Sequence, residues 1–259
     1  MNPLAYARRL KSTWVRHASL RRLAIPGQPL RHFCWQASAD DGRREPACTF
    51  AVGSLRLSAL PVDIAAIEEV LVQDEYHTAL ERLATAGPAP AMVDLGANIG
   101  TVSALSLARR PDARITSVEA GPDTFARLAA NRAANPGLDW TTVHAAAAGR
   151  SGSMQFSCGP LSTGGRVGGS AGVEVPARTL VELLPPGLIT LLKVDIEGAE
   201  EELLRAGEEQ LARVATIVIE LHPARCDAEA CRAILARCFP TVTTVGGRRS
   251  TKPVLLAHR

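Results

Sequence analysis

The sequence predicts an α/β fold built on a mostly parallel sheet, and three features indicate it. From residue 91 onward, short apolar runs predict strands at 91–95, 114–119, 140–144, 189–195 and 214–220. Helical patterns alternate with these runs or follow them, at about 100–110, 123–134, 198–206 and 227–238. Apolar runs flanked by helices are typical of buried parallel strands, because helices cover both faces of such a sheet. The last two runs, 240–245 and 252–257, predict a closing hairpin that places one antiparallel strand in the sheet.

The first 90 residues predict a less regular region. Short strands are expected at 31–37 and 48–57, and helices at 63–72 and 75–85. A Gly-Pro-Ala-Pro run at 87–90 ends this region, because proline stops helices and favours extended chain. We therefore divide the chain into a basic extension (1–30), a region of short strands and helices packing on the sheet (31–90) and a ligand-binding domain (91–259).

Composition excludes several classes of protein. Hydrophobic residues make up 46% of the 259 residues, which is enough for a sizeable core and argues against global disorder. A net charge of +3 gives no indication of nucleic acid as a partner. No run of about 18 apolar residues predicts a transmembrane helix. The six cysteines form no C-x-x-C pair, so we expect reduced thiols in a cytoplasmic protein. The spacing of Cys226, Cys231 and Cys238 fits no common zinc pattern, so we expect no metal.

The basic N-terminus leaves two interpretations open. Residues 1–31 carry seven Lys or Arg and no acidic residue. Apolar residues at helical spacing within 4–23 are consistent with a solvated or weakly docked extension, the interpretation we prefer. The alternative is a basic amphipathic helix in weak contact with an anionic membrane surface. The segment does not have the pattern of a secretory signal.

The strongest local motif is VDLGANIG, residues 93–100. An apolar strand ends at Asp94, and Gly96 and Gly100 then form the turn into a helix whose first N–H groups are expected to be free. The spacing G-x-x-x-G differs from the dinucleotide fingerprint G-x-G-x-x-G. Glu119 ends the next strand, where a carboxylate can accept hydrogen bonds from ribose hydroxyls. Together these features favour an adenosine-type ligand, although a dinucleotide also carries such a ribose.

Two further strand ends carry candidate catalytic groups. In LLKVDIEGAEEELL (191–204), Lys193 and Asp195 share one side of the strand, and Glu197 follows in the turn. These groups can tune one another's pKa values, or they can form a salt-bridged strand end that only fixes the loop. In ELHP (220–223), His222 is expected at the rim of the cleft, as a general base or as a packing group.

The stretch 149–178 interrupts the alternation. Two strand-like pieces, 153–158 and 173–177, flank the Gly-rich loop 159–172. Long loops in compact domains are usually functional or mobile, so this loop is expected to be a substrate lid or a disordered excursion.

These motifs, in this order, resemble the FkbM family of S-adenosylmethionine-dependent methyltransferases. The resemblance runs from about Gln73 to Pro223 and includes QDEYHTALE, VDLGANIG, the asparagines Asn131 and Asn135, VPARTLVELL and KVDIEGAEEELL. It implies a class I methyltransferase Rossmann-like sheet, mostly parallel with one antiparallel strand. It also implies S-adenosyl-L-methionine as cofactor and methyl transfer to a hydroxyl of a sugar, a glycan or a secondary metabolite.

The resemblance also implies roles for individual residues. The methionine part of the cofactor would be surrounded by Asp94, Gly96, Asn98 and Gly100. Glu119 would hold the ribose, and the loop 145–147 would border the adenine. The predicted cofactor-binding set also includes Ala97, Ala120 and Ala146. The family often has Glu-Pro after the second strand, whereas this chain has Glu-Ala-Gly-Pro at 119–122.

We expect direct in-line methyl transfer, with Asp195 as first choice and His222 as second choice for the general base. Lys193 and Glu197 complete the predicted catalytic set. Three alternatives remain: N-methylation of a small molecule or protein, a nicotinamide-dependent oxidoreductase, and a non-catalytic methyltransferase scaffold. The missing G-x-G-x-x-G spacing argues against the oxidoreductase, and the intact glycine turn argues against the scaffold.

Overall fold

The computed structural model describes residues 47–157, 166–167, 172–246 and 251–259. The basic extension, the strand expected at 31–37 and most of the Gly-rich loop 159–172 lie outside the described residues. The proposed division into domains stays a prediction.

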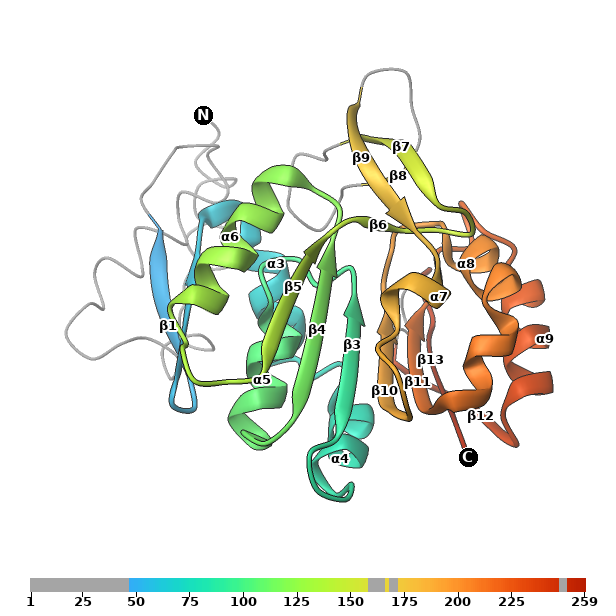
Figure 1. Cartoon of the computed structure of the whole chain (residues 1–259), viewed down its shortest axis with the longest axis horizontal. Coiled ribbons are helices and arrows are strands. Elements are labelled where there is room, and N and C mark those ends of the chain that lie inside the picture. The colour runs from blue at the N-terminus through green and yellow to red at the C-terminus, as the bar shows by residue number, and fades with distance from the viewer. Residues whose placement is uncertain (1–46, 158–165, 168–171, 247–250) are drawn as a thin grey trace, which may run out of the picture.

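A seven-stranded sheet forms the centre of the molecule, in the order β12-β13-β11-β10-β3-β4-β5 (Figure 1). Its strands are β3 (Ala91–Leu95), β4 (Arg114–Glu119), β5 (Trp140–His144), β10 (Ile189–Val194), β11 (Val214–Glu220), β12 (Thr241–Gly246) and β13 (Val254–His258). β13 runs antiparallel to both of its neighbours, and the other pairs are parallel. The predicted fold class is therefore confirmed, with β13 as the one antiparallel strand.

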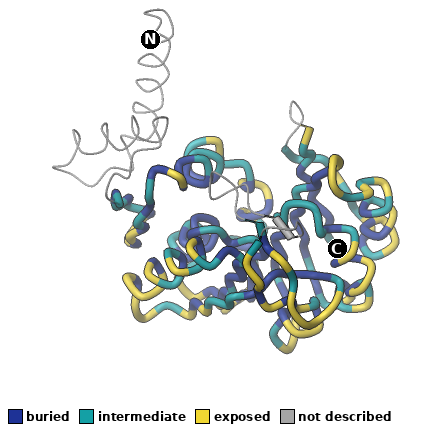
Figure 2. The backbone as a smooth tube through the Cα atoms, turned by 90° about the horizontal axis from the view of Figure 1, so that it is seen from above, coloured by how far each residue is buried: buried dark blue, intermediate teal, exposed yellow. Residues whose placement is uncertain are grey.

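The strands of this sheet are largely buried (Figure 2), because they carry apolar side chains on both faces. Successive strand residues point to opposite faces, so Met92 and Leu191 belong to one core cluster while Val93 and Leu192 belong to the other. The first cluster includes helices α3 (Ile64–Ile67), α4 (His77–Ala84), α5 (Thr101–Arg109) and α6 (Pro122–Ala133). The second includes α7 (Leu180–Leu183), α8 (Glu200–Ala206), the 3-10 helix η5 (Glu208–Arg213) and α9 (Ala228–Cys238).

A second, four-stranded sheet lies beside the carboxyl end of the main sheet, in the order β6-β9-β7-β8 (Figure 1). Its strands are β6 (Ala146–Ala147), β7 (Gly152–Ser157), β8 (Arg166–Val167) and β9 (Val173–Arg178). The strand-like pieces expected at 153–158 and 173–177 thus pair with each other, antiparallel. The two-residue strands β6 and β8 were not predicted, because so few residues carry no periodicity.

One predicted strand is wrong. The run 48–57 folds as an antiparallel hairpin of β1 (Cys48–Val52) and β2 (Leu55–Ala59). The chain turns at Gly53, whose φ of +59° lies in the left-handed region that glycine adopts readily. The helix expected at 63–72 is a composite of the 3-10 turn η2 (Pro61–Asp63), α3 and the π-helical turn η3 (Glu68–Val72).

Two asparagines, Asn131 in α6 and Asn135 just after its end, hold the hairpin against the main domain. The side chain of Asn131 accepts from the backbone N–H of Ser58 and donates to the carbonyl oxygens of Ser58 and Ile99. Asn135 repeats this pattern one turn later, bonding both the N–H and the carbonyl of Arg56. The two amides therefore satisfy backbone groups along β2 much as a neighbouring strand would.

Candidate active site

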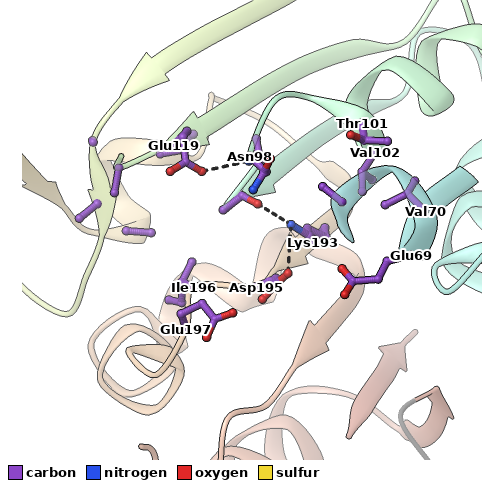
Figure 3. Close-up of a pocket in the computed structure, with 18 of the residues that line it drawn as sticks. Glu69, Val70, Asn98, Thr101, Val102, Glu119, Lys193, Asp195, Ile196 and Glu197 are labelled. Carbon is purple, nitrogen blue, oxygen red and sulfur yellow. Dashed lines mark hydrogen bonds and ion pairs between the residues drawn. The ribbon is translucent and has the colours of Figure 1, made fainter. Parts of the chain in front are cut away.

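A pocket opens at the carboxyl ends of β3, β4 and β10, where ligands bind in open α/β sheets. Its empty volume is about 810 Å³, including space open to solvent. The lining comes from the glycine turn, the loops after β4, β5 and β10, and the helical segment 66–76 (Figure 3).

The glycine turn after β3 supplies one wall of the pocket. Gly96, Ala97 and Asn98 line it, as predicted. The turn's N–H groups are not free, however: those of Gly96 and Ala97 donate to the carbonyl of Val118, and that of Asn98 donates to Glu119. The next two N–H groups are also bonded within the turn. The turn therefore uses the N–H groups of 96–100 for its own shape, and the expectation of free N–H groups concerns the start of α5 at Thr101 and stays a prediction.

Glycine is required at two points of this turn for packing. A Cβ on Gly96 would lie 1.7 Å from the carbonyl oxygen of Asp195, so the absence of a side chain allows the turns after β3 and β10 to touch. A Cβ on Gly100 would lie 2.7 Å from the ring of Trp140. Gly100 is therefore a packing residue, and it is not among the residues that line the pocket. Its contact with the cofactor stays a prediction.

Asp94 also lies beneath the pocket and not on its surface. Its carboxylate is fully buried, 3.1 Å from the ammonium of Lys193, and accepts a hydrogen bond from Ser103. Burial alone would lower the pKa of Lys193, but Asp94 and Asp195 raise it, so the lysine stays charged. Lys193 also donates to the carbonyl oxygens of Leu95 and Gly96. This buried ion pair fixes the glycine turn from below.

Glu119 lies on the pocket wall opposite Lys193 (Figure 3). One carboxylate oxygen accepts from the N–H of Asn98 and the other from the N–H of Gly121. Each oxygen keeps further acceptor capacity, so both hydroxyls of a ribose can donate to it. Burial raises the pKa of Glu119, and the two N–H donors oppose that rise.

The rest of the wall fits a nucleoside with an amino-acid tail. Ala120 and the loop 145–147, including Ala146, line the pocket beside Phe156, which gives apolar contact for a purine. Thr101 adds a buried hydroxyl that has no hydrogen-bond partner within the described part of the chain. The donor set and the shape therefore fit S-adenosyl-L-methionine.

Asp195 lies at the end of β10, where the pocket meets the strand. Its Oδ2 is 3.9 Å from the ammonium of Lys193 and accepts a long hydrogen bond of 3.5 Å from the hydroxyl of buried Tyr76. Its Oδ1 is buried and has no hydrogen-bond partner among the described residues. Burial raises the pKa of Asp195, while Lys193 and His222 oppose the rise.

His222 is not at the rim of the cleft, which corrects the sequence-based placement. It is only 3% exposed and lies behind Asp195, outside the pocket lining. Burial would lower its pKa, but the carboxylates of Glu197 and Glu200 raise it to about 9. Without another cation bound beside it, His222 is therefore protonated at neutral pH.

Glu197 lines the pocket in a left-handed backbone conformation, with φ of +57°. Its carboxylate is 2.7 Å from Arg225 and 3.1 Å from Lys252. Burial would raise the pKa of Glu197, but His222 and Lys252 lower it to about 2. The side chain is therefore a firmly ionised bridge between the turn after β10 and two basic residues.

Sequence reasoning missed the pocket residues that precede the sheet. Glu69 and Tyr76 line the pocket, and Glu69 points toward Lys193 and Asp195 (Figure 3). Burial and the charge of Asp195 raise the pKa of Glu69 to about 7. Tyr76 falls within the QDEYHTALE stretch, so that motif offered a signal; Glu69 lies in a π-helical turn that no sequence pattern marks.

Sheet order and pocket position define a protein of the class I methyltransferase type. The methyltransferase FkbM domain matches residues 94–239, more than half of the chain, and the chain belongs to that family. Membership in a methyltransferase family agrees with S-adenosyl-L-methionine as the cofactor.

Known proteins similar to this chain include the hexuronic acid methyltransferase AglP of Haloferax volcanii. The two are 28% identical over 134 residues, which is 50% of this chain and 54% of AglP, so the chain spans about half the length of this curated relative. Similar solved structures include a precorrin-6y C5,15-methyltransferase from Geobacter metallireducens, with TM-score 0.45 and 15% identity over 73% of this chain and 88% of that one. The N-terminal domain of EvdMO1, solved with SAH bound, has TM-score 0.43 and 15% identity over 71% of this chain and 79% of that one.

Within the described ranges, no helix combines the length and apolar character needed to span a membrane.

Proposed function

We propose that this chain transfers a methyl group from S-adenosyl-L-methionine to a hydroxyl oxygen, with a sugar or glycan as the preferred acceptor class. The observation that carries the oxygen assignment is Asp195, a carboxylate on the pocket wall with a raised pKa and an unpartnered oxygen. The sugar assignment is supported by the similarity to a hexuronic acid methyltransferase.

When bound, the cofactor supplies an electrophilic methyl group, so the chain's own task is to orient the acceptor and accept its proton. A hydroxyl is a weak nucleophile, and a well-placed base accelerates its reaction by roughly 10²–10⁴-fold. Burial brings the pKa of Asp195 closer to neutral, which improves a carboxylate as a base. Asp195 is therefore assigned as the group that orients the acceptor hydroxyl and receives its proton.

Neighbouring groups hold Asp195 in place. Lys193 and Tyr76 contact Oδ2, and each is anchored in the core. His222, protonated at neutral pH, lies 3.9 Å from Oδ1 and serves as a positioning group, not as the base. This arrangement assigns one proton acceptor, Asp195, and three groups that position it, Lys193, Tyr76 and His222.

The test is methyl transfer by the purified full-length chain, measured by mass spectrometry over a panel of uronic acids, neutral sugars and amines. We expect products methylated on oxygen, and a fall of roughly 10²–10⁴-fold in kcat for Asp195→Asn with unchanged cofactor binding by calorimetry. Asp139→Asn, an exposed aspartate outside the pocket, is the matched control and should keep full activity.

Cofactor binding is tested separately by calorimetry with S-adenosyl-L-methionine and, in parallel, NAD. Glu119→Ala should weaken the binding of S-adenosyl-L-methionine, and NAD should not bind to the chain. Methylated amines with full turnover by Asp195→Asn would overturn the oxygen assignment and leave an N-methyltransferase. Cofactor binding without turnover of any acceptor would favour the scaffold alternative.

A further inference from the structure

Behind Asp195, a buried imidazole nitrogen faces a group of carboxylates. Nε2 of His222 has no hydrogen-bond partner in the described part of the chain, although the residue is 97% buried. Buried polar atoms normally have a partner, so an unpartnered nitrogen indicates a site for a ligand or an ion. Three carboxylate oxygens lie around it: Glu197 at 3.3 Å, Glu220 at 3.5 Å and Asp195 at 3.9 Å.

The other ring nitrogen fixes the direction of this imidazole. Nδ1 of His222 lies 2.7 Å from the carboxylate of fully buried Glu200, which also accepts from the N–H of Gly198. A carboxylate that receives the Nδ1–H bond is the usual partner of a histidine that binds a metal through Nε2. Glu200 therefore orients the Nε2 atom toward the carboxylates of Glu197, Glu220 and Asp195.

The ligand atoms have the spacing of a metal site. Asp195, Glu220 and His222 each offer one atom, and these three atoms lie within 4.8 Å of one another. Two ligands ~2.1 Å from a tetrahedral ion lie ~3.4 Å apart, close to the 3.5 Å between His222 and Glu220. The 3.9 Å between His222 and Asp195 is longer, so an ion bound there would draw the Asp195 carboxylate inward.

We propose that Nε2 of His222 and the carboxylates of Asp195 and Glu220 bind one divalent transition-metal ion, and that the ion displaces the Nε2 proton of His222 to solvent as it binds. One imidazole with two carboxylates suits Mn²⁺ or Zn²⁺ and leaves open positions for exogenous oxygen ligands. Glu197 is not assigned as a ligand, because Arg225 and Lys252 already engage its carboxylate.

The charges around the site are consistent with a cation there. Asp195, Glu197 and Glu220 face Nε2, and Glu200 lies on the other side of the ring. The facing cations are Lys193 beside Asp195, Arg225, which is 2.7 Å from Glu197, and Lys252, which is 3.5 Å from Glu220. The Lys252 side chain is 41% exposed, so it can turn toward solvent when an ion approaches.

The ion would act on the acceptor through its open positions; this step rests on the proposed function. Asp195 belongs to both the pocket lining and the metal-ligand group, so an ion bound there lies at the pocket edge. A divalent ion binds hydroxyl and carboxylate oxygens and makes a bound hydroxyl more acidic. The acceptor class that fits is one with adjacent oxygen ligands, such as a vicinal diol or a hydroxy acid.

The site is tested with Mn²⁺ and the full-length chain after EDTA dialysis, without cofactor or acceptor. Electron paramagnetic resonance of free Mn²⁺ should show saturable binding of one ion per chain. Pulsed resonance should show modulation from one directly bound imidazole nitrogen. Glu220→Gln and His222→Gln should each weaken binding by at least ~10-fold, the lower end of the cost of losing even an outer group.

His77→Gln is the matched control, because His77 is exposed and pairs only with Asp74 in the described structure. It should leave Mn²⁺ affinity unchanged. Absence of saturable binding up to 1 mM, absence of nitrogen modulation, or full affinity in the folded Glu220→Gln and His222→Gln variants would overturn the site. If those variants do not fold, the imidazole nitrogen modulation in the pulsed spectrum of the unsubstituted chain tests whether His222 binds the ion.

Failure of the site and failure of the proposed function remain distinguishable. Mn²⁺ binding without methylation of any hydroxyl would leave the site standing and refute the function. Full methyl transfer in EDTA with no Mn²⁺ binding would refute the site and leave the function standing.

Discussion

Replacing Lys193 by methionine tests whether a buried charge holds the glycine turn. Lys193 lies 3.1 Å from fully buried Asp94 and donates to the carbonyl oxygens of Leu95 and Gly96 at 3.3 and 2.8 Å. Methionine keeps most of the side-chain volume but leaves the Asp94 carboxylate without its cation. Removing one partner of a buried ion pair costs about 3–5 kcal/mol, and we expect Lys193→Met to lower the free energy of unfolding by that amount.

Two further variants separate charge from packing. Adding Asp94→Asn removes the unpaired charge, so the unfolding free energy of the double variant should return to within about 1–3 kcal/mol of the unsubstituted chain. The remaining difference comes from the carbonyls of Leu95 and Gly96, which lose the hydrogen bonds from Lys193. Lys252→Met removes a lysine from a pair that is partly exposed, and it should cost only about 0–1 kcal/mol.

The assay is urea unfolding at pH 7, monitored by circular dichroism. The variants can be compared when the unfolding free energy depends on urea concentration with the same slope in each. A cost below 1 kcal/mol for Lys193→Met would refute the argument. So would a double variant less stable than Lys193→Met alone, because the loss would then not come from the unpaired carboxylate.

Three other predictions concern turn, hairpin and pH. Gly96→Ala should cost more than about 3 kcal/mol in urea unfolding and abolish cofactor binding, because its Cβ meets Asp195, whereas Gly137→Ala, also left-handed but with open space, should cost only about 1–2 kcal/mol. Asn131→Ala should lower the free energy of unfolding by about 2–3 kcal/mol, because the backbone N–H and carbonyl of Ser58 in β2 lose their hydrogen-bond partner. A change near zero would contradict the view that Asn131 holds the hairpin. Burial raises the pKa of Glu69 from 4.5 to about 7, so its ionisation removes stability as the pH rises from 4.5 through 7. In metal-free buffer, Glu69→Gln should therefore raise the unfolding free energy by about 1–2 kcal/mol at pH 8, after allowance for solvent screening, and by nothing at pH 4; equal effects at both values would contradict it.

Strand positions in the main sheet were predictable because each strand carries its own local signal. The predicted bounds 91–95, 114–119, 140–144 and 214–220 match the structure to the residue. Each is an apolar run bounded by proline, glycine or a polar strand end, which is the pattern a buried parallel strand requires. The run 48–57 was misread because its apolar residues continue across the turn at Gly53, and no proline interrupts them.

The pocket was predictable in part, for a related reason. Carboxyl ends of parallel strands meet at one edge of the sheet, so the turn after β3, Glu119 and Asp195 were expected together, and the structure brings them together. Which residues of these motifs reach the pocket surface was not predictable. Asp94 and Gly100 belong to the same motif as Gly96, yet they do not line the pocket. Asp94, in β3, contacts Ser103 and Lys193 in the interior, and Gly100 packs against Trp140.

The sequence by itself determined the fold class, the family resemblance and some of the residues that line the pocket, such as Gly96, Glu119 and Asp195, because these depend on local periodicity and on spacing along the chain. Only the tertiary structure decided the environment of His222. Its burial depends on α8, which carries Glu200, on the strand end that carries Glu220, and on the turn that carries Asp195. Charge state and ligand geometry depend on distances between these separate segments, and spacing along a chain does not encode such distances.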